Sequence, residues 1–498
     1  MEERKKNNRN LTMRAALLVR LVLVAALCSF FALAQQPARF YAQIDIDGIG
    51  PASLDRLKAN PGFAWWVEMD QILVVLAEAP VLANLGKQQK VTVLRDIPVK
   101  PEQLSVLRFD HFRDVGALDA YVLGRGGRFA LLQLRSTPPK THHDGEHKHP
   151  LYFDAFQPNR VLAAQSANRV GARKRAVDPA IQALVNQVDG DRWLADVTTL
   201  AGWNRHSFGT EIDDARDWLV AQFSQIDGLT VSTEDFDLSG TTLQNVVARI
   251  DGTTTPDRWY VIGAHYDSTS NNTSAAAPGA EDNASGTAGV LEMARVLAAM
   301  EPESTIIFMC YSGEEQGLHG SQSHVNRLIS DNDLDKVQIV LTMDMIGYTN
   351  DNDLDVLLET EQRVSWLVNL LETAAFDYTD LRSVVSYNPF GSDHIPYLNA
   401  GLDSLLVIEN DYTSYPSYHR TTDTIQNVNL AMGRESLKMN VAVMADQIGF
   451  PRTRIPAWQP WLIRWRASPD ASAPDQVVDR IINVLDFVSM VNDLNTAR

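Results

Sequence analysis

The strongest constraint on the fold of this chain is an alternation of apolar strand-like segments and helix-like segments between residues 176 and 452. The segments "RWYVIGAH", "STIIFMCY" and "VQIVLTM" are almost continuously apolar, whereas "SGTAGVLEMARVLAAM", "EQRVSWLVNLLETAA" and "RESLKMNVAVMADQI" are typical of helices. Strands that are apolar on both sides indicate a sheet with helices on both faces. The sequence therefore predicts an α/β fold with catalytic groups at the ends of its strands.

The amino-terminal region has a different pattern. Residues 35–140 mix strand-like pieces such as "RFALLQLRS" with helix-like pieces, so we predict a small α+β domain without clustered chemistry. Residues 141–175 follow a change to prolines and polar residues and are expected to be a linker. A histidine-rich tract can hold a metal, but a solvated linker is the favoured interpretation for its four histidines, His142, His143, His147 and His149.

The first 34 residues have the three-part pattern of a secretory signal peptide, with a basic start, an apolar run and a small-x-small end at Ala32 and Ala34. The apolar run is shorter than the ~20 residues that a membrane span needs, which argues against a stable membrane anchor. We therefore expect cleavage after Ala34 and a secreted or periplasmic protein. Cleavage would leave Cys310 as the remaining cysteine, an inert core thiol without an internal disulfide.

The carboxyl-terminal tail, residues 453–498, is separate from the strand–helix alternation. It resembles a degenerate dockerin-like half-repeat, in which four residues fall at calcium-loop positions: Asp475, Asp479, Asn483 and Asp486. The fit is poor because Val477 takes a ligand position and Arg480 stands where the loop needs glycine. An amphipathic docking helix is the favoured interpretation of this tail.

The overall charge argues against nucleic acid as a partner. The formal net charge is −18 and the isoelectric point is about 5.0. A protein that binds nucleic acid needs a basic surface for its phosphate contacts, so we expect no nucleic-acid partner. The acidic surface suits a soluble protein that stays dispersed.

Five short motifs at or near the ends of expected strands carry residue types that bind metals or move protons. The motifs are "GAHYDS", "PGAEDNASG", "SGEEQG", "LTMDMIGY" and "PSYHRTTDT". Their candidate residues are His265 and Asp267, Asp282, Glu314 and Glu315, Asp344, and Tyr418, His419 and Asp423. Histidine nitrogens with carboxylate oxygens, and no thiolate, suit Zn²⁺ in a Lewis-acid or water-activating role.

The adjacent glutamates are the most informative pair among these candidates. Two like charges after a buried strand repel each other and cost desolvation energy, and a bound metal ion would offset that repulsion. Glu314 and Glu315 point in different directions on a turn, so one can bind a metal while the other faces a water. Taken singly, each motif has an ordinary interpretation as a helix cap, a solvated face or a core residue, and the argument depends on their joint occurrence.

Seven segments resemble, in order, the motifs of the secreted bacterial zinc aminopeptidases that use two co-catalytic metals. They are "NVVARIDG", "GAHYDS", "EDNASG", "SGEEQGLHGS", "MDMIG", "GSDH" and "YHRTTDT". That family also includes glutamate carboxypeptidases and, more remotely, glutaminyl cyclases and transferrin-receptor ectodomains. The resemblance covers residues 176–450 and implies a mixed central sheet of the zinc exopeptidase type.

The resemblance also implies a ligand set for two Zn²⁺ ions. Asp282 would bridge both metals. His265 and Asp344 would complete one site, and Glu315 and His419 would complete the other.

Four further roles follow from the same resemblance. Glu314 would be the general base that takes a proton from the attacking water and returns it to the leaving amine. Asp267 would orient the ring of His265, and Tyr418 would steady the oxyanion. "GSDH" would line or support the substrate cleft.

The implied activity is hydrolysis of the amino-terminal bond of peptides that have a free amino terminus. A carboxypeptidase or dipeptidase of the same family is an alternative, but it needs cations for a substrate carboxylate, and only Arg382 and Arg420 are candidates. A glutaminyl cyclase on a single zinc, or a binding protein without activity, are further alternatives. The amino-terminal segment is interpreted as a propeptide that blocks the cleft, with a permanent accessory domain as the alternative.

Overall fold

The computed structural model describes residues 38–108, 118–137, 141–144, 147–150, 152–165, 177–351 and 353–451. The expected signal peptide and the tail lie outside these residues. Within them, no helix is both long enough and apolar enough to cross a membrane.

The strands of the described chain are β1 Arg39–Asp45, β2 Phe63–Asp70, β3 Ile72–Glu78, β4 Val91–Leu94, β5 Leu104–Arg108, β6 Ala120–Gly126, β7 Phe129–Leu134, β8 Thr141–Asp144, β9 His147–Pro150, β10 Tyr152–Ala155, β11 Arg160–Gln165, β12 Thr230–Leu238, β13 Thr241–Ile250, β14 Thr255–His265, β15 Ser304–Tyr311, β16 Val337–Met343, β17 Asp355–Glu359, β18 Arg382–Ser386 and β19 Ser404–Glu409. The helices are α2 Pro51–Lys58, α3 Ala79–Leu85, α4 Pro179–Val185, α5 Gly190–Leu200, α6 Glu211–Phe223, α7 Gly286–Ala298, α8 His319–Ser330, α9 Ser365–Tyr378, α10 His394–Asn399 and α11 Leu430–Ile448.

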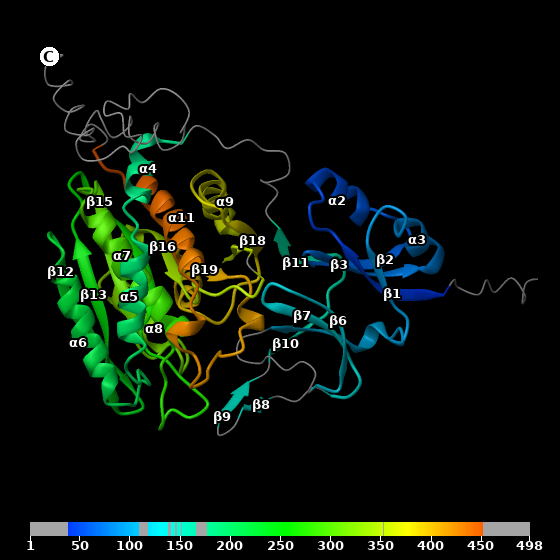
Figure 1. The fold of residues 1–498 in the computed structure, drawn as a ribbon, viewed down its shortest axis with the longest axis horizontal. Helices are drawn as coiled ribbons and strands as arrows, with labels where there is room; N and C mark the ends of the chain where they lie inside the picture. Colours follow the sequence, from blue (N-terminus) through cyan, green and yellow to red (C-terminus); the bar gives the residue numbers. More distant parts are fainter. Residues whose placement is uncertain are drawn as a thin grey trace, which may run out of the picture.

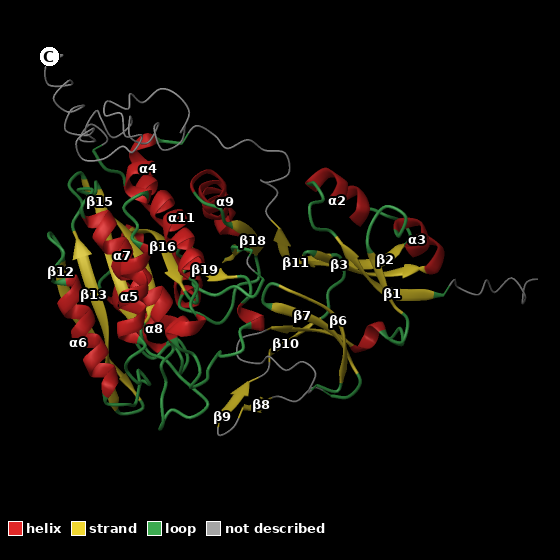
Figure 2. Ribbon diagram, in the orientation of Figure 1, coloured by secondary structure: helices red, strands yellow, loops and turns green. Residues whose placement is uncertain are grey.

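One large mixed sheet organises the molecule (Figures 1 and 2). Its strand order is β12-β13-β15-β14-β16-β19-β17-β18-β11-β2-β3-β1-β4. At its centre β14 runs parallel to both β15 and β16, whereas β13 is antiparallel to β15. The prediction of an α/β fold with a mixed central sheet is therefore confirmed.

Alternate residues of the central strands face two different helix layers. On β14, Tyr260 and Ile262 belong to the core beneath α4, α5, α6, α7, α9 and α11. Trp259 and Val261 belong to the opposite core, with Val325 of α8 and residues of α10. Because successive side chains point to opposite faces of the sheet and helices cover both faces, these strands are apolar throughout. They lack the alternation of polar and apolar residues seen in a sheet with one face in solvent.

The helix α11 begins earlier than its apolar pattern predicts. We expected a helix over 434–448, and the structure begins it at Leu430. The side chain of Asn429 accepts hydrogen bonds from the backbone N–H groups of Ala431 and Met432, a cap that allows the helix to start there.

The amino-terminal part contains helices and strands, as expected, but its sheet is continuous with the central sheet. Strand β11 pairs with β2 on one side and with β18 on the other. Part of the segment expected to be a linker, 141–175, is therefore strand, and its four histidines fall in the paired strands β8 and β9. Figure 1 shows β11 between the blue amino-terminal strands and the yellow-green β18. A second sheet, β10-β5-β7-β6, packs below the amino-terminal strands.

Candidate metal centre

Three neighbouring parallel strands bring the candidate residues to one edge of the sheet. His265 is the last residue of β14, Glu314 and Glu315 follow β15, and Asp344 follows β16. Because the carboxyl ends of parallel strands meet at one edge, residues far apart in the sequence become neighbours there. Asp282 reaches the same place from the turn that precedes α7.

Two groups of possible metal-binding residues share Asp282. One group is His265, Asp282 and Asp344, and the other is Asp282, Glu315 and His419, with the ligand atoms of each group within 4.8 Å of one another. These are the two sets that the family resemblance implies, and the described chain places them side by side.

The distances between ligand atoms are consistent with zinc. The Nε2 atom of His265 lies 3.5 Å from Oδ1 of Asp282 and 3.4 Å from Oδ1 of Asp344. The Nε2 atom of His419 lies 3.0 Å from Oδ2 of Asp282 and from Oε2 of Glu315. Ligands of a tetrahedral zinc ion are roughly 3.3 Å apart, given zinc–ligand bonds of about 2.0–2.1 Å.

One buried oxygen also indicates a missing positive partner. Oε1 of Glu315 is buried and has no hydrogen-bond partner among the described residues. A buried carboxylate oxygen without a partner is costly, and a cation beside it removes that cost. The residues present therefore fit a pair of zinc ions in both geometry and donor chemistry.

The carboxylates raise the pKa of both histidines. Burial lowers the pKa of His265, but neighbouring carboxylates, Glu314 foremost, raise it well above its ordinary value. Burial likewise opposes protonation of His419, and Glu315 with Asp282 raises its pKa to about 10. The two histidines in turn hold the pKa of Asp282 below its ordinary value, although burial acts in the opposite direction. The site is thus a concentration of negative potential that attracts cations.

Asp267 holds the turn that carries the two glutamates. Its carboxylate accepts hydrogen bonds from the backbone N–H groups of Glu314 at 3.2 Å and Glu315 at 3.3 Å, and from the hydroxyl of Ser207 at 3.0 Å. Its backbone carbonyl oxygen lies 3.1 Å from Nδ1 of His265. A proton on Nδ1 suits that contact and leaves Nε2 available as a metal ligand.

Asp282 is positioned by a residue to which the sequence assigned no role. The carboxylate of Asp423 accepts hydrogen bonds from the backbone N–H groups of both Glu281 and Asp282, and the hydroxyl of Tyr415 donates to it. The motif "YHRTTDT" singled out Asp423, but its contacts required the fold.

Arg205 is a supporting residue that the sequence analysis missed. It is fully buried, and burial lowers the pKa of its guanidinium to about 10. The guanidinium donates hydrogen bonds to the carbonyl oxygens of Leu200, Tyr266, Pro278 and Gly279, so it joins the segment after β14 to the turn before Asp282. The local sequence "WNRHS" gives no signal for this role.

A small cavity opens onto the candidate metal-binding residues. Glu314, Tyr418 and three of the candidate ligands, Asp282, Asp344 and His419, line it, together with Arg128, Met345, Gly391, Ile408 and Tyr412. The ring of Tyr418 stacks on the ring of His419, with centroids 3.9 Å apart and planes at 17°. Arg128 comes from the amino-terminal part and is the second residue that the sequence analysis missed.

The "GSDH" motif lies beside the metal-binding residues. The hydroxyl of Ser392 donates a 2.8 Å hydrogen bond to Oδ2 of Asp344. Asp393 and His394 are buried, and burial, ahead of the neighbouring charges, raises the pKa of Asp393 to about 7. The motif thus contacts a candidate metal-binding carboxylate, and its expected place at the substrate cleft stays a prediction.

Comparisons with known proteins match part of this chain. Residues 245–444 match the model of Peptidase family M28. A "Probable zinc metalloprotease" of Pyrenophora teres f. teres (strain 0-1) is 35% identical over 192 residues, which cover 34% of this chain and 39% of that protein. "Aminopeptidase YwaD" of Bacillus subtilis (strain 168) is 34% identical over 176 residues, 35% of this chain and 37% of that protein. The chain thus spans less than half the length of these curated relatives, and the resemblance is confirmed over the matched segment.

A similar solved structure is the LapA aminopeptidase of Legionella pneumophila. It is 20% identical, has a TM-score of 0.49, and the match covers 70% of this chain and 98% of that chain.

Proposed function

We propose that this chain is a zinc-dependent aminopeptidase, a secreted hydrolase that removes amino-terminal residues from peptides and uses two Zn²⁺ ions as cofactors. One observation carries the proposal. Two groups of metal-binding residues share Asp282, and the carboxylate of Glu314 lies beside them, with Oε2 at 4.0 Å from Nε2 of His265. Nitrogen and oxygen ligands around two neighbouring metals, with a spare carboxylate, form the working set of a hydrolytic site.

The candidate metal-binding residues are one shared residue and two separate pairs. Asp282 would contact both ions, His265 and Asp344 would hold one, and Glu315 and His419 would hold the other. Bound zinc would supply Lewis-acid polarisation of the scissile carbonyl and activation of a water. The names and the family match of the relatives support zinc as the metal.

Glu314 would move the proton. It follows the buried strand β15 and its side chain is 11% exposed. Burial, with the charges of Asp393 and Asp344, raises the pKa of Glu314 well above its ordinary value, although His265 opposes the shift. A carboxylate with a raised pKa can accept a proton from the attacking water and return it to the leaving amine.

Asp267 would position the turn that carries the two glutamates, and Tyr418 would stabilise the oxyanion. Asp267 keeps the backbone N–H groups of the two glutamates in place, which fixes the direction in which each side chain leaves the turn. Tyr418 lines the cavity, and its phenol would donate a hydrogen bond to the developing oxyanion.

The acidic cavity supports recognition of a free amino terminus. Glu314 lines it beside the candidate ligands Asp282 and Asp344, and the amine of a substrate would have a bound zinc ion or Glu314 as its partner there. The name of the YwaD relative favours the same assignment. Export to the periplasm or the medium rests on the signal-peptide pattern of residues 1–34.

The test compares leucine-p-nitroanilide with its N-acetylated form, using purified full-length protein and added zinc. We expect release of nitroaniline from the free-amine substrate alone. Equal rates on the two substrates, or release from neither, would contradict the proposal.

A dipeptidase is the second candidate, because Arg128 lines the cavity as a cation that could face a substrate carboxylate. However, Nη1 of Arg128 already forms a 2.9 Å ion pair with Glu359, which reduces its attraction for another anion. Rates on Leu-Gly and on Leu-Gly-amide separate the candidates. A dipeptidase would prefer the free carboxylate, whereas an aminopeptidase would accept both.

A further inference from the structure

The segment 387–393 connects β18 to α10 and contains Ser392, which contacts a candidate metal ligand. Ser392 donates its hydroxyl hydrogen bond to Oδ2 of Asp344, whose Oδ1 faces His265. The position of Ser392 therefore affects how the carboxylate of Asp344 is presented. Partners of this kind orient metal ligands and tune the affinity of a metal site.

Arg128, in the turn between β6 and β7, holds the end of this segment. Its guanidinium donates 2.9 Å and 3.0 Å hydrogen bonds to the carbonyl oxygens of Phe390 and Gly391, and a 2.9 Å hydrogen bond to Oε1 of Glu359. The same oxygen of Glu359 accepts the backbone N–H of Phe390 at 3.2 Å. Arg128 is 2% exposed, so water does not compete with these bonds.

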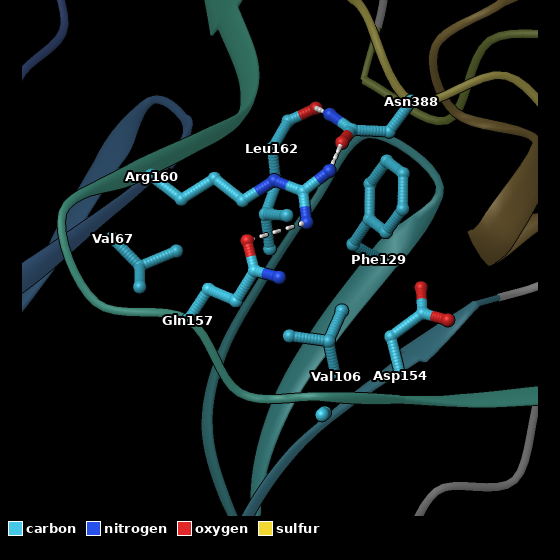
Figure 3. A pocket seen from close by; sticks show the side chains of 9 residues that line it. Val67, Val106, Phe129, Asp154, Gln157, Arg160, Leu162 and Asn388 are labelled. Carbon is cyan, nitrogen blue, oxygen red and sulfur yellow. Dashed lines mark hydrogen bonds between the residues drawn. The ribbon is translucent and has the colours of Figure 1, made fainter.

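Other residues of the amino-terminal part hold the rest of the segment. Figure 3 shows the guanidinium of Arg160 against the side chain of Asn388. The amide nitrogen of Asn388 donates to the carbonyl oxygen of Leu162 on β11 at 3.2 Å, and Figure 3 draws this contact as well. The ring of Phe129 meets the ring of Phe390 edge to face, with centroids 5.6 Å apart.

The two parts of the molecule also share one apolar core. Leu107, Ala130 and Leu132 of the amino-terminal part belong to the same buried cluster as Leu357, Ile408 and Tyr412. Strand β11 pairs directly with β18. Loss of the amino-terminal part would expose this core and leave an unpaired strand edge, both of which favour aggregation.

We propose that the amino-terminal part, residues 38–165, is a permanent component of the catalytic unit and that Arg128 is a positioning residue for the metal centre. Arg128 fixes the carbonyl groups of Phe390 and Gly391, the segment fixes Ser392, and Ser392 orients Asp344. This replaces the removable propeptide of the sequence-based interpretation. The inference rests on the proposed function only in assuming that zinc binds at these residues.

The first test measures zinc affinity without any substrate. Full-length protein is freed of metal with a chelator and titrated with Zn²⁺ in competition with a chromophoric chelator. We expect Arg128→Ala to lower the affinity for one of the two zinc ions by roughly tenfold, because Asp344 belongs to only one of the two groups of metal-binding residues. Arg125→Ala, an exposed arginine on the neighbouring strand, should leave both affinities unchanged.

A double mutant tests the route through Ser392. Ser392→Ala should weaken the binding of the same zinc ion. Adding Arg128→Ala to it should lower the zinc affinity by less than about a further threefold, because both changes act through one contact. Arg128→Lys, which keeps a charge for Glu359 but cannot reach both carbonyl groups, gives a second variant should Arg128→Ala not fold. Wild-type zinc affinity in folded Arg128→Ala or Arg128→Lys would overturn the proposal. Failure of the wild type to cleave leucine-p-nitroanilide would overturn the proposed function and leave this result standing.

The second test asks whether the amino-terminal part remains with the rest of the protein. Full-length protein is cut with trypsin in the basic stretch "GARKRA", residues 171–176. We expect the two fragments to elute together in gel filtration with zinc content and activity no higher than before cutting. Release of the amino-terminal fragment with a rise in activity would show a propeptide and overturn the inference.

Discussion

Asp423 accepts the backbone N–H of Asp282 in a 3.1 Å hydrogen bond, and its other carboxylate oxygen accepts the preceding N–H at 2.9 Å. A residue near the carboxyl end of the described chain thereby fixes the backbone of Asp282, which both groups of possible metal-binding residues share. Burial raises the pKa of Asp423 to about 6, and its hydrogen bonds to Tyr415 and to these two amides oppose that rise.

Asp423→Ala should lower the affinity for both zinc ions, because the two hydrogen bonds from backbone N–H groups to Asp423 set the direction of the shared residue Asp282. We expect a loss of roughly 10- to 100-fold in metal affinity, measured by competition with a chromophoric chelator. Asp423→Asn keeps one acceptor oxygen and should lose less of the metal affinity than Asp423→Ala. A loss confined to one zinc ion would contradict this account of Asp282.

Glu314→Gln should lower kcat by roughly 10²- to 10⁴-fold, since a neutral amide cannot accept the proton of the attacking water. Because Glu314 lies outside the two groups of metal-binding residues, zinc content should remain that of the wild type. Steady-state kinetics on leucine-p-nitroanilide, beside metal analysis of the same sample, checks both statements. Near-normal kcat in the metal-replete variant would exclude Glu314 as the general base.

His419→Ala should reduce the bound zinc from two ions to one and lower thermal stability. A ligand that binds the folded state at 100 times its Kd stabilises it by about 2.7 kcal/mol, and the variant forfeits that contribution at one site. Metal analysis and thermal unfolding with and without a chelator measure the effect. His206→Ala, outside both groups, is the matched control and should retain both ions. Two tightly bound ions in His419→Ala would remove His419 from the ligand set.

The central sheet, and the position of the candidate metal-binding residues at the ends of its strands, could be predicted from the sequence because both follow local rules. His265 ends an apolar strand, the two glutamates and Asp344 follow others, and parallel strands bring such ends to one edge. Each motif could therefore be found without knowledge of the strand order.

The supporting residues could not be predicted in this way. Arg128 contacts Glu359, 231 residues further along the chain, and nothing in the sequence near either residue marks the pairing. Strand β11 was expected to be linker, because its pairing with β18 depends on contacts more than 200 residues apart, which local polarity does not report. Fold-dependent contacts of this kind decide how the ligands are held.

Asp70→Asn should stabilise the protein at neutral pH. Asp70 is 8% exposed at the end of β2, and burial raises the pKa of its carboxyl above the ordinary value, although a hydrogen bond from Asn410 opposes the rise. An acid whose pKa is higher in the folded state binds its proton more tightly there. Stability is therefore largest below the ordinary pKa of about 3.9 and falls as pH rises through the folded value.

The asparagine removes the cost of the buried charge and keeps the amide contact. It also tolerates the positive φ of 54° at this position, which most side chains resist. We expect the unfolding midpoint of Asp70→Asn in urea to exceed that of the wild type at pH 7, with the difference shrinking towards pH 4. Asp47→Asn is the matched control, because Asp47 is an exposed carboxylate 3.6 Å from the same Arg382 that lowers the pKa of Asp70. A lower midpoint for Asp70→Asn at pH 7 would mean that the attraction between Asp70 and Arg382 outweighs the desolvation of the carboxylate.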